Sequence, residues 1–146
     1  MTEAQHPIVD VEPGKSEPMV TPDTRAYWDS AARGVLSVQQ CRKCGTAYFY
    51  PRPVCPSCGA TDIEWITASG RATLLSYVIS HRPAPGFEPP FVIAVVRLEE
   101  GPQMMTNIVG VTPAPENLVL DMPLTVEFER RGATCVPVFR PAGAAS

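Results

Sequence analysis

Apolar and polar residues alternate in short stretches through the second half of the chain. Between residues 124 and 129, Leu, Val and Phe alternate with Thr and Glu, a period of two that is typical of a half-buried β-strand. Four more β-rich runs, separated by Gly and Pro, cover residues 71–81, 91–99, 103–111 and 134–139. The pattern therefore predicts five strands.

Five strands of this length favour a small closed barrel. The OB-fold is a five-stranded Greek-key barrel, and residues 112–123 form a longer connection between the third and fourth strands. We therefore expect a mainly β protein with an OB-fold at residues 70–141. A β-sandwich of similar size is the alternative.

A helical pattern precedes these strands. Tyr27, Trp28 and the two alanines four residues after them form one apolar stripe. Thr21 followed by proline resembles a helix start, and Gly34 a helix end. Residues 21–40 are thus expected to hold a helix of about three turns and a lead-in strand. Because Trp and Tyr often anchor interfaces, Tyr27 and Trp28 either pack on their own domain or bind a partner protein.

The two ends of the chain carry no such pattern. Residues 1–20 are rich in Pro, Glu and small polar side chains, a composition typical of disorder. We expect a disordered leader at residues 1–20 and a short tail at 142–146.

Between helix and barrel, residues 41–69 contain two Cys-x-x-Cys-Gly units. Cys41 and Cys44 form the first pair, and after ten residues Cys55 and Cys58 form the second. Two such knuckles can place four thiolates around one tetrahedral ion, with no position left for water or substrate. The spacing predicts a structural zinc ribbon with one zinc per chain.

These cysteines have three other possible roles, of which four unligated side chains in the core is the weakest. Disulfides require an oxidising compartment, and the chain begins Met-Thr-Glu-Ala-Gln without a basic-then-apolar leader. Iron in a rubredoxin-like cage uses the same four sulfurs, and ligand softness and geometry do not separate the two metals. Zinc is favoured because short knuckle spacing is more commonly a zinc site.

Composition and charge limit the classes of function that the chain can have. The chain of 146 residues is 45% hydrophobic, with 17 prolines. Its longest apolar run falls far short of the roughly 20 residues that span a bilayer, so we expect a cytoplasmic protein away from membranes. The net charge is −3, yet four of the 15 acidic residues and one of the 12 basic ones lie in the first 21 positions. The remainder is balanced, which argues against nucleic acid as a partner.

No catalytic constellation is visible. His6 and His81 have no evident partner, and Cys135 lies in an apolar strand without a base beside it. The chain has no glycine-rich nucleotide loop and no nucleophile elbow. We name no catalytic residue and do not expect an enzyme that acts alone.

The chain is similar to a known family. The similarity lies in the two knuckles and in the runs at residues 27–34, 70–73 and 91–96. The chain resembles the zinc-ribbon plus OB-fold proteins first catalogued as a domain of unknown function, over about residues 21–141. The resemblance implies a non-catalytic subunit, in a hetero-oligomer with a thiolase-like enzyme such as a keto-acyl-CoA thiolase or a steroid side-chain aldolase. It also implies an acyl-CoA substrate.

In that context the loop at residues 82–90 is the expected ligand contact. Its four prolines stiffen the backbone. Phe87 and Phe91 offer apolar contacts, and Arg82 can meet a CoA phosphate or a partner carboxylate. The alternative is an ordinary surface turn.

The sequence alone leaves two other functions open. Zinc ribbons and OB-folds also occur in nucleic-acid-binding proteins, which use aromatic platforms and basic grooves. A rubredoxin-like electron carrier would require iron in place of zinc.

Overall fold

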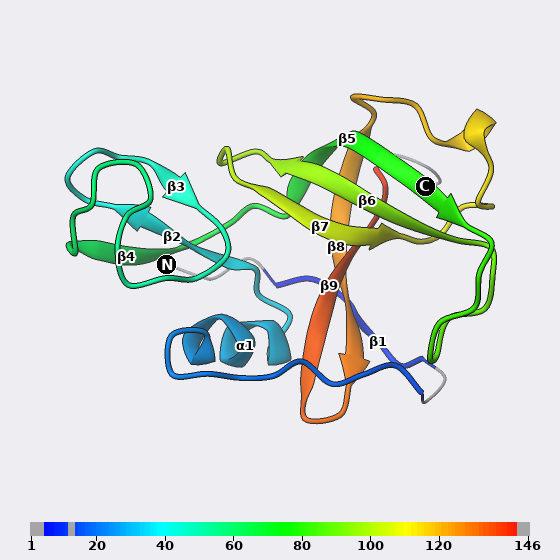
Figure 1. The fold of residues 1–146 in the computed structure, drawn as a ribbon, viewed down its shortest axis with the longest axis horizontal. Coiled ribbons are helices and arrows are strands. Elements are labelled where there is room, and N and C mark those ends of the chain that lie inside the picture. The colour runs from blue at the N-terminus through cyan, green and yellow to red at the C-terminus, as the bar shows by residue number, and fades with distance from the viewer. Residues whose placement is uncertain (1–4, 12–13, 143–146) are drawn as a thin grey trace.

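A computed structural model describes residues 5–11 and 14–142. Strands β2 (Ser37–Cys41), β3 (Ala47–Tyr48) and β4 (Ile63–Thr67) form one small sheet in the order β3-β2-β4. The larger sheet contains β5 (Arg71–Ser80), β6 (Phe91–Leu98), β7 (Gln103–Ile108), β8 (Pro123–Arg131) and β9 (Thr134–Pro141). Figure 1 shows the small sheet beside the large one.

The large sheet closes into a barrel. Its strands follow the order β8-β5-β6-β7-β9, and β9 pairs again with β8 along its whole length. This is the five-stranded OB-fold that the alternation predicted, and the closure excludes a sandwich. The connection between β7 and β8 holds one 3₁₀ turn, Pro115–Asn117.

The barrel is closed only weakly between β7 and β9. These parallel strands pair at a single position, Ile108 with Phe139. Next to it, Pro137 of β9 has no N–H to offer to β7, and its carbonyl instead accepts a hydrogen bond of 3.0 Å from the Thr106 hydroxyl. The rest of β7 is therefore an open edge along one seam of the barrel.

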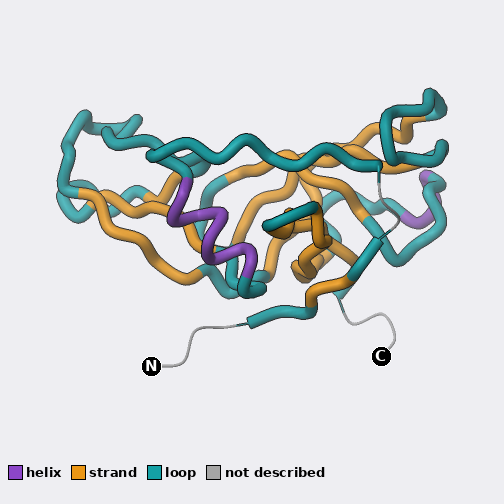
Figure 2. Tube along the Cα trace, turned by 90° about the horizontal axis from the view of Figure 1, so that it is seen from below, coloured by secondary structure: helices purple, strands orange, loops and turns teal. Residues whose placement is uncertain are grey.

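Helix α1 (Arg25–Ala32) lies beside β9 and β2, between the small sheet and the barrel (Figure 2). It is shorter than expected, because residues 22–24 form a turn and Thr24, not Thr21, occupies the N-cap position. Gly34 ends the helical segment with φ of +77°. Tyr27, Trp28 and Ala31 are buried by the helix, so its apolar stripe packs on the chain's own core.

The core is continuous across these elements. One cluster of buried side chains joins α1, β2 and the barrel strands, with Leu36, Leu74, Phe128 and Phe139 fully enclosed. Burial of this apolar surface holds the barrel and helix together as one body.

The N-terminal segment, for which the sequence suggested disorder, contains a strand in its described part. Strand β1 (Ile8–Val9) pairs in parallel with β8, Ile8 opposite Phe128. Further on, residues 14–20 run along the barrel toward α1 (Figure 1); we call residues 14–20 the strap. Backbone pairing, which needs no hydrophobic pattern, explains why composition did not predict this strand. Residues 1–4, 12–13 and 143–146 lie outside the described part.

Candidate functional site: a metal centre and an aromatic groove

The two knuckles have the same backbone geometry. The N–H of Gly45 donates to the Cys41 carbonyl and that of Gly59 to the Cys55 carbonyl, both at 2.9 Å. Both glycines have positive φ, +80° and +79°, which only glycine adopts without cost. Each turn thereby directs its two cysteines toward the same point.

The four sulfurs fit a tetrahedral metal ion. All four Sγ atoms lie within 4.8 Å of one another, and Cys41–Cys58 and Cys44–Cys55 are each 3.6 Å apart. A Zn–S bond of about 2.3 Å in a tetrahedron requires sulfur–sulfur distances of about 3.8 Å. The chain therefore has one four-cysteine zinc site.

Hydrogen bonds surround the cysteine sulfurs and shift the pKa of two of them in opposite directions. The N–H of Cys44 lies 3.4 Å from Cys41 Sγ, and the N–H of Ser57 lies 3.3 Å from Cys55 Sγ. Hydrogen bonds with the Thr46 side chain and backbone lower the pKa of Cys44 to about 6. A hydrogen bond with the Ala60 backbone lowers the pKa of Cys58, but burial and hydrogen bonds with the other three cysteines outweigh it and raise that pKa to about 11. Because four thiolates fill the tetrahedral shell, the centre stabilises structure and leaves no position for substrate.

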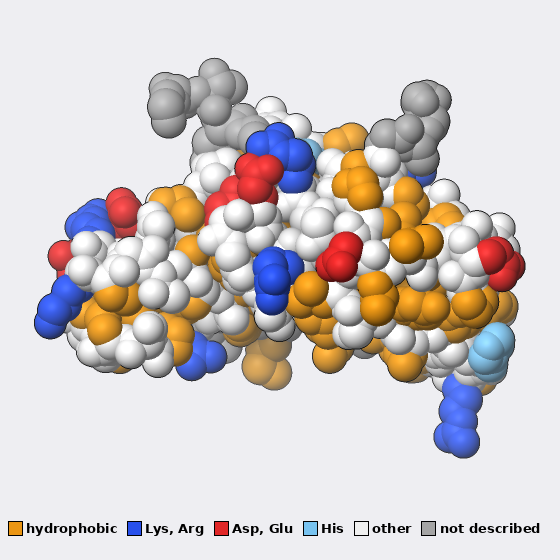
Figure 3. Space-filling model, turned by 90° about the horizontal axis from the view of Figure 1, so that it is seen from above, with side chains coloured by type: hydrophobic (Ala, Val, Ile, Leu, Met, Phe, Trp, Pro, Cys, Tyr) orange, Lys and Arg blue, Asp and Glu red, His pale blue; other side chains and the backbone are white. Residues whose placement is uncertain are grey.

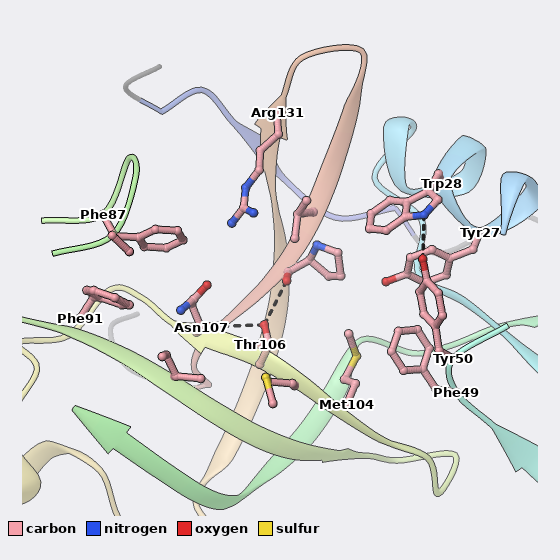
Figure 4. A pocket seen from close by; sticks show the side chains of 15 residues that line it. Tyr27, Trp28, Phe49, Tyr50, Phe87, Phe91, Met104, Thr106, Asn107 and Arg131 are labelled. Carbon is pink, nitrogen blue, oxygen red and sulfur yellow. Dashed lines mark hydrogen bonds between the residues drawn. The ribbon is translucent and has the colours of Figure 1, made fainter. Parts of the chain in front are cut away.

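A second feature is a groove of about 540 Å³ over the open edge of β7 (Figure 4). Six of the 11 aromatic residues of the chain line it, along with apolar side chains and a few polar ones. The lining residues are Tyr27, Trp28, Phe49, Tyr50, Ala84, Phe87, Phe91, Ile93, Met104, Met105, Thr106, Asn107, Arg131, Val136 and Pro137. An apolar cleft of this size with few polar groups is typical of a binding site.

One wall of the groove is an aromatic cluster from α1 and the end of β3. The rings of Tyr27 and Trp28 meet edge to face at 4.7 Å, and those of Phe49 and Tyr50 at 5.1 Å. The indole Nε1 of Trp28 donates a 3.0 Å hydrogen bond to the Tyr50 hydroxyl. This wall joins the ribbon to the helix and is rigid because each ring contacts another.

The opposite wall is Phe87, in the loop between β5 and β6. Its ring lies 4.8 Å from that of Phe91. The ammonium of Lys15, in the strap, lies 4.3 Å above the Phe87 ring, and the Arg131 guanidinium lies 5.6 Å from it. Two cations and a second ring thus hold Phe87 in place.

The same two cations share one carboxylate. Glu129, which is 3% exposed, accepts a hydrogen bond of 2.8 Å from Lys15 Nζ and one of 2.9 Å from Arg131, both on Oε1. Gly14 and Gly86 meet where the strap crosses the loop, and a Cβ on Gly86 would overlap the Lys15 backbone. The strap is therefore tied both to the barrel and to the Phe87 wall.

Replacing Lys15 by Met should loosen this wall without disturbing the barrel. Arg131 still neutralises Glu129 in this variant, so we expect a loss of only about 1 kcal/mol in the free energy of unfolding. Hydrogen exchange of the loop amides at residues 84–88 should become faster. The exposed Lys43→Met substitution is the control, and unchanged exchange in the Lys15→Met variant would contradict the role given to the strap.

Only some of the ligand-binding and partner-binding residues predicted from the sequence lie in one site. Phe87, Phe91, Tyr27 and Trp28 all line the groove, although two sequence arguments had placed them at separate sites. Arg82 is not among the lining residues; its described contacts are with Ser80.

Tyr27 is 1% and Trp28 8% exposed, so only their edges reach the groove. Sequence reasoning missed Phe49, Tyr50 and Arg131. The aromatic run before Pro51 was a signal for the first two, but nothing in the sequence marked Arg131.

Within the described residues, the other reactive side chains do not come together in a site. His6 lies against Gly70, and burial lowers its pKa despite a hydrogen bond with the Ser69 backbone. Cys135 is fully buried, and burial raises the pKa of its thiol, so it is a poor nucleophile. The amide of Asn107 donates to the Val92 carbonyl at 2.7 Å, a structural contact between β7 and β6.

Four arginines at the surface form ion pairs. Arg42, Arg71, Arg130 and Arg140 each pair with a carboxylate, so these arginines do not form a basic groove of the kind that tracks a nucleic-acid backbone. Within the described residues, no helix is both long and apolar enough to cross a membrane.

Fold and metal centre together define a zinc-ribbon protein with a C-terminal OB-fold. Two family models match in this order: the rubredoxin-like zinc ribbon domain of ChsH2 at residues 28–64 and the C-terminal OB-fold domain of ChsH2 at residues 65–129. The chain belongs to this ChsH2 family, whose members are also called DUF35 proteins.

Curated relatives carry related names. The chain is 35% identical over 130 residues to a probable enoyl-CoA hydratase alpha subunit of Thermomonospora curvata. The match covers 88% of this chain but only 40% of that relative. This chain is also 36% identical over 94 residues to a DUF35 domain-containing scaffold protein of Methanocaldococcus jannaschii. That match covers 62% of this chain and 65% of the scaffold protein.

A solved structure has the same fold. One chain of the Ltp2-ChsH2(DUF35) aldolase superposes with a TM-score of 0.78 at 35% identity, over 86% of this chain and 99% of that one. The expected family and fold are thereby confirmed.

Proposed function

We propose that the chain is a non-catalytic, zinc-binding accessory subunit. It assembles as a hetero-oligomer with a thiolase-like enzyme, a keto-acyl-CoA thiolase or a side-chain aldolase, and helps to bind or enclose that enzyme's acyl-CoA. The observation that carries this proposal is the match to the ChsH2 chain of an aldolase, which extends over 99% of that chain.

The chemistry of the chain supports an accessory role. Its metal has a complete set of four sulfur ligands, and its one remaining cysteine, Cys135, is buried, which raises the pKa of its thiol. We also place the protein in the cytoplasm, because four thiolates persist unoxidised in a reducing compartment.

The groove is the surface on which we place the acyl-CoA contact. Its volume of about 540 Å³ lies within the roughly 300–1,000 Å³ range of small-molecule sites. The aromatic walls offer apolar contact to an acyl body, while a partner that covers the open side would exclude water from it.

Co-expression tests the assembly. The tagged chain, produced with the thiolase-like proteins of its own organism, should retain one of them through size-exclusion chromatography. The isolated chain should show no thiolase, aldolase or hydrolase turnover. If none is retained, or if the pure chain cleaves acyl-CoA beyond a mock preparation, this function is wrong.

Two substitutions distinguish apolar contact with the ligand from contact with its CoA phosphates. In the assembled complex, Phe87→Ala should weaken binding of both acyl-CoA and acyl-pantetheine about fivefold to tenfold, because it removes apolar contact. Arg82→Ala should weaken acyl-CoA alone, because Arg82 is proposed to meet a phosphate that acyl-pantetheine lacks. Equal binding of both ligands by both variants would show that this loop does not contact the ligand.

A further inference from the structure

Strand β6 has apolar residues on both of its faces. All six residues from Phe91 to Val96 are apolar, a pattern typical of strands that are covered on both sides. Val92, Ala94 and Val96 point into the barrel and are buried. Phe91, Ile93 and Val95 point outward and are only half-buried.

The neighbouring strands extend this outer face. Across the sheet, Ile93 pairs with Val78 of β5, and Val95 pairs with Met105 of β7. Val78 is 58% and Met105 71% exposed. We call Val78, Phe91, Ile93, Val95 and Met105 the β6 face. Figure 3 shows hydrophobic side chains gathered over the half of the molecule that carries the barrel.

Strand β8 shows the ordinary alternation of apolar and polar residues on another face of the same barrel. Leu124, Val126 and Phe128 point inward and are buried, while Thr125 and Glu127 alternate with them on the outside. Glu127 is also paired with Arg140. The absence of this alternation in β6 is therefore a property of one face and not of the whole barrel.

The ends of the β6 face carry arginines without a carboxylate partner in the described part of the chain. Arg97 is exposed on the outer side of β6, opposite Gln103 and one row beyond Val95. Arg82, which the proposed function assigns to a CoA phosphate, follows the C-terminal end of β5, where Ser80 pairs with Phe91. Five other arginines do have carboxylate partners. A surface that matches this one is apolar at its centre and bears carboxylates at its rim.

We propose that the β6 face is the docking surface for the thiolase-like partner, which presents an apolar patch bordered by carboxylates. This inference rests on the proposed function and gives it a location. The face adjoins the groove, since Phe91, Ile93 and Met105 also line the groove. A partner seated on the β6 face would reach the open side of the groove, whereas Tyr27 and Trp28 of α1 are buried in the chain's own core.

Charged substitutions at the two most exposed positions of the face test the proposal. Met105→Glu and Val78→Glu should each raise the Kd of the complex roughly tenfold or more, because a carboxylate becomes buried opposite apolar surface and partner carboxylates. Val119→Glu and Thr125→Glu are the controls: Val119 is 61% exposed in a loop, and Thr125 lies on the outer side of β8. Both controls should bind as the unmodified chain does, and all four variants should keep their zinc and melting temperature.

Association kinetics test whether Arg97, at the rim of the β6 face, attracts carboxylates of the partner. Arg97→Glu should slow association and reduce its dependence on salt, whereas Arg25→Glu on α1 should not.

The outcomes separate the two proposals. If the unmodified chain forms the complex and Met105→Glu and Val78→Glu bind equally well, the β6 face is not the interface, although the accessory function stands. If the unmodified chain finds no partner, both ideas fail. If the free chain is a dimer that Met105→Glu makes monomeric, while the variant still binds its partner, the face belongs to a second copy of this chain.

Discussion

Stripping the zinc from this chain should unfold the ribbon and leave the barrel folded. The separate cluster of buried residues in the ribbon contains only Cys41, Tyr48 and Cys55, with Ala60 and Ile63 beside it. Two of these three buried residues are metal ligands, so little apolar burial remains around the knuckles without the ion, although Val38 of β2 and Ile66 of β4 pack in or against the main core. Structural zinc contributes about 10–16 kcal/mol in small zinc modules, far more than this cluster can replace.

Elemental analysis should find one zinc per chain, and a chelator should abolish protection of the β2–β4 amides from hydrogen exchange. Cys44→Ser should have the same effect as the chelator. Cys135→Ser is the matched control, because it removes a thiol that is not near the cage and should retain one zinc. One equivalent of iron with a red colour, or a Cys44→Ser variant that folds and holds metal normally, would show that the site is misassigned.

Trp28→Ala should lower the free energy of unfolding by about 3–5 kcal/mol, as removal of a buried Trp side chain usually does. The indole is 8% exposed, contacts Tyr27, and donates its N–H to Tyr50. The substitution therefore removes one of the contacts that join α1 to the ribbon, while Tyr27 still packs against Phe49 and Tyr50. Urea denaturation should measure the loss.

The other tryptophan provides the comparison. Trp65 is 37% exposed on β4, so Trp65→Ala should cost less than about 1 kcal/mol. Trp28→Phe keeps a ring in the cluster and should recover most of the stability lost in Trp28→Ala. A Trp28→Ala chain as stable as the unmodified one, but unable to bind its partner, would instead make Trp28 an interface residue. That was one of the two roles that the sequence left open.

The elements that sequence predicted correctly are those whose signal is local. The Cys-x-x-Cys-Gly spacing indicates the metal cage because each knuckle is one short turn. The alternation in β8 indicates a barrel strand because neighbouring side chains face opposite sides. Both patterns depend on residues within a few positions of one another.

The groove and the N-terminal strand could not be predicted from such local patterns. Phe49 and Phe87 lie in different parts of the fold, and they line one groove only because the barrel stays open between β7 and β9. The pairing of Ile8 with β8 uses backbone groups that every residue carries. Arg131 lines the groove because it pairs with Glu129, two residues away. Lys15, far away in sequence, pairs with the same carboxylate.

The strap has a consequence for anyone who shortens this protein. A version that begins at residue 21 keeps the helix, the ribbon and every barrel strand from β5 to β9. It nevertheless loses Lys15, which covers the Phe87 ring and pairs with Glu129, and Gly14, which packs against Gly86. Such a fragment would fold and bind zinc, yet its groove would have one loose wall, and ligand affinities measured on it would underestimate those of the longer chain.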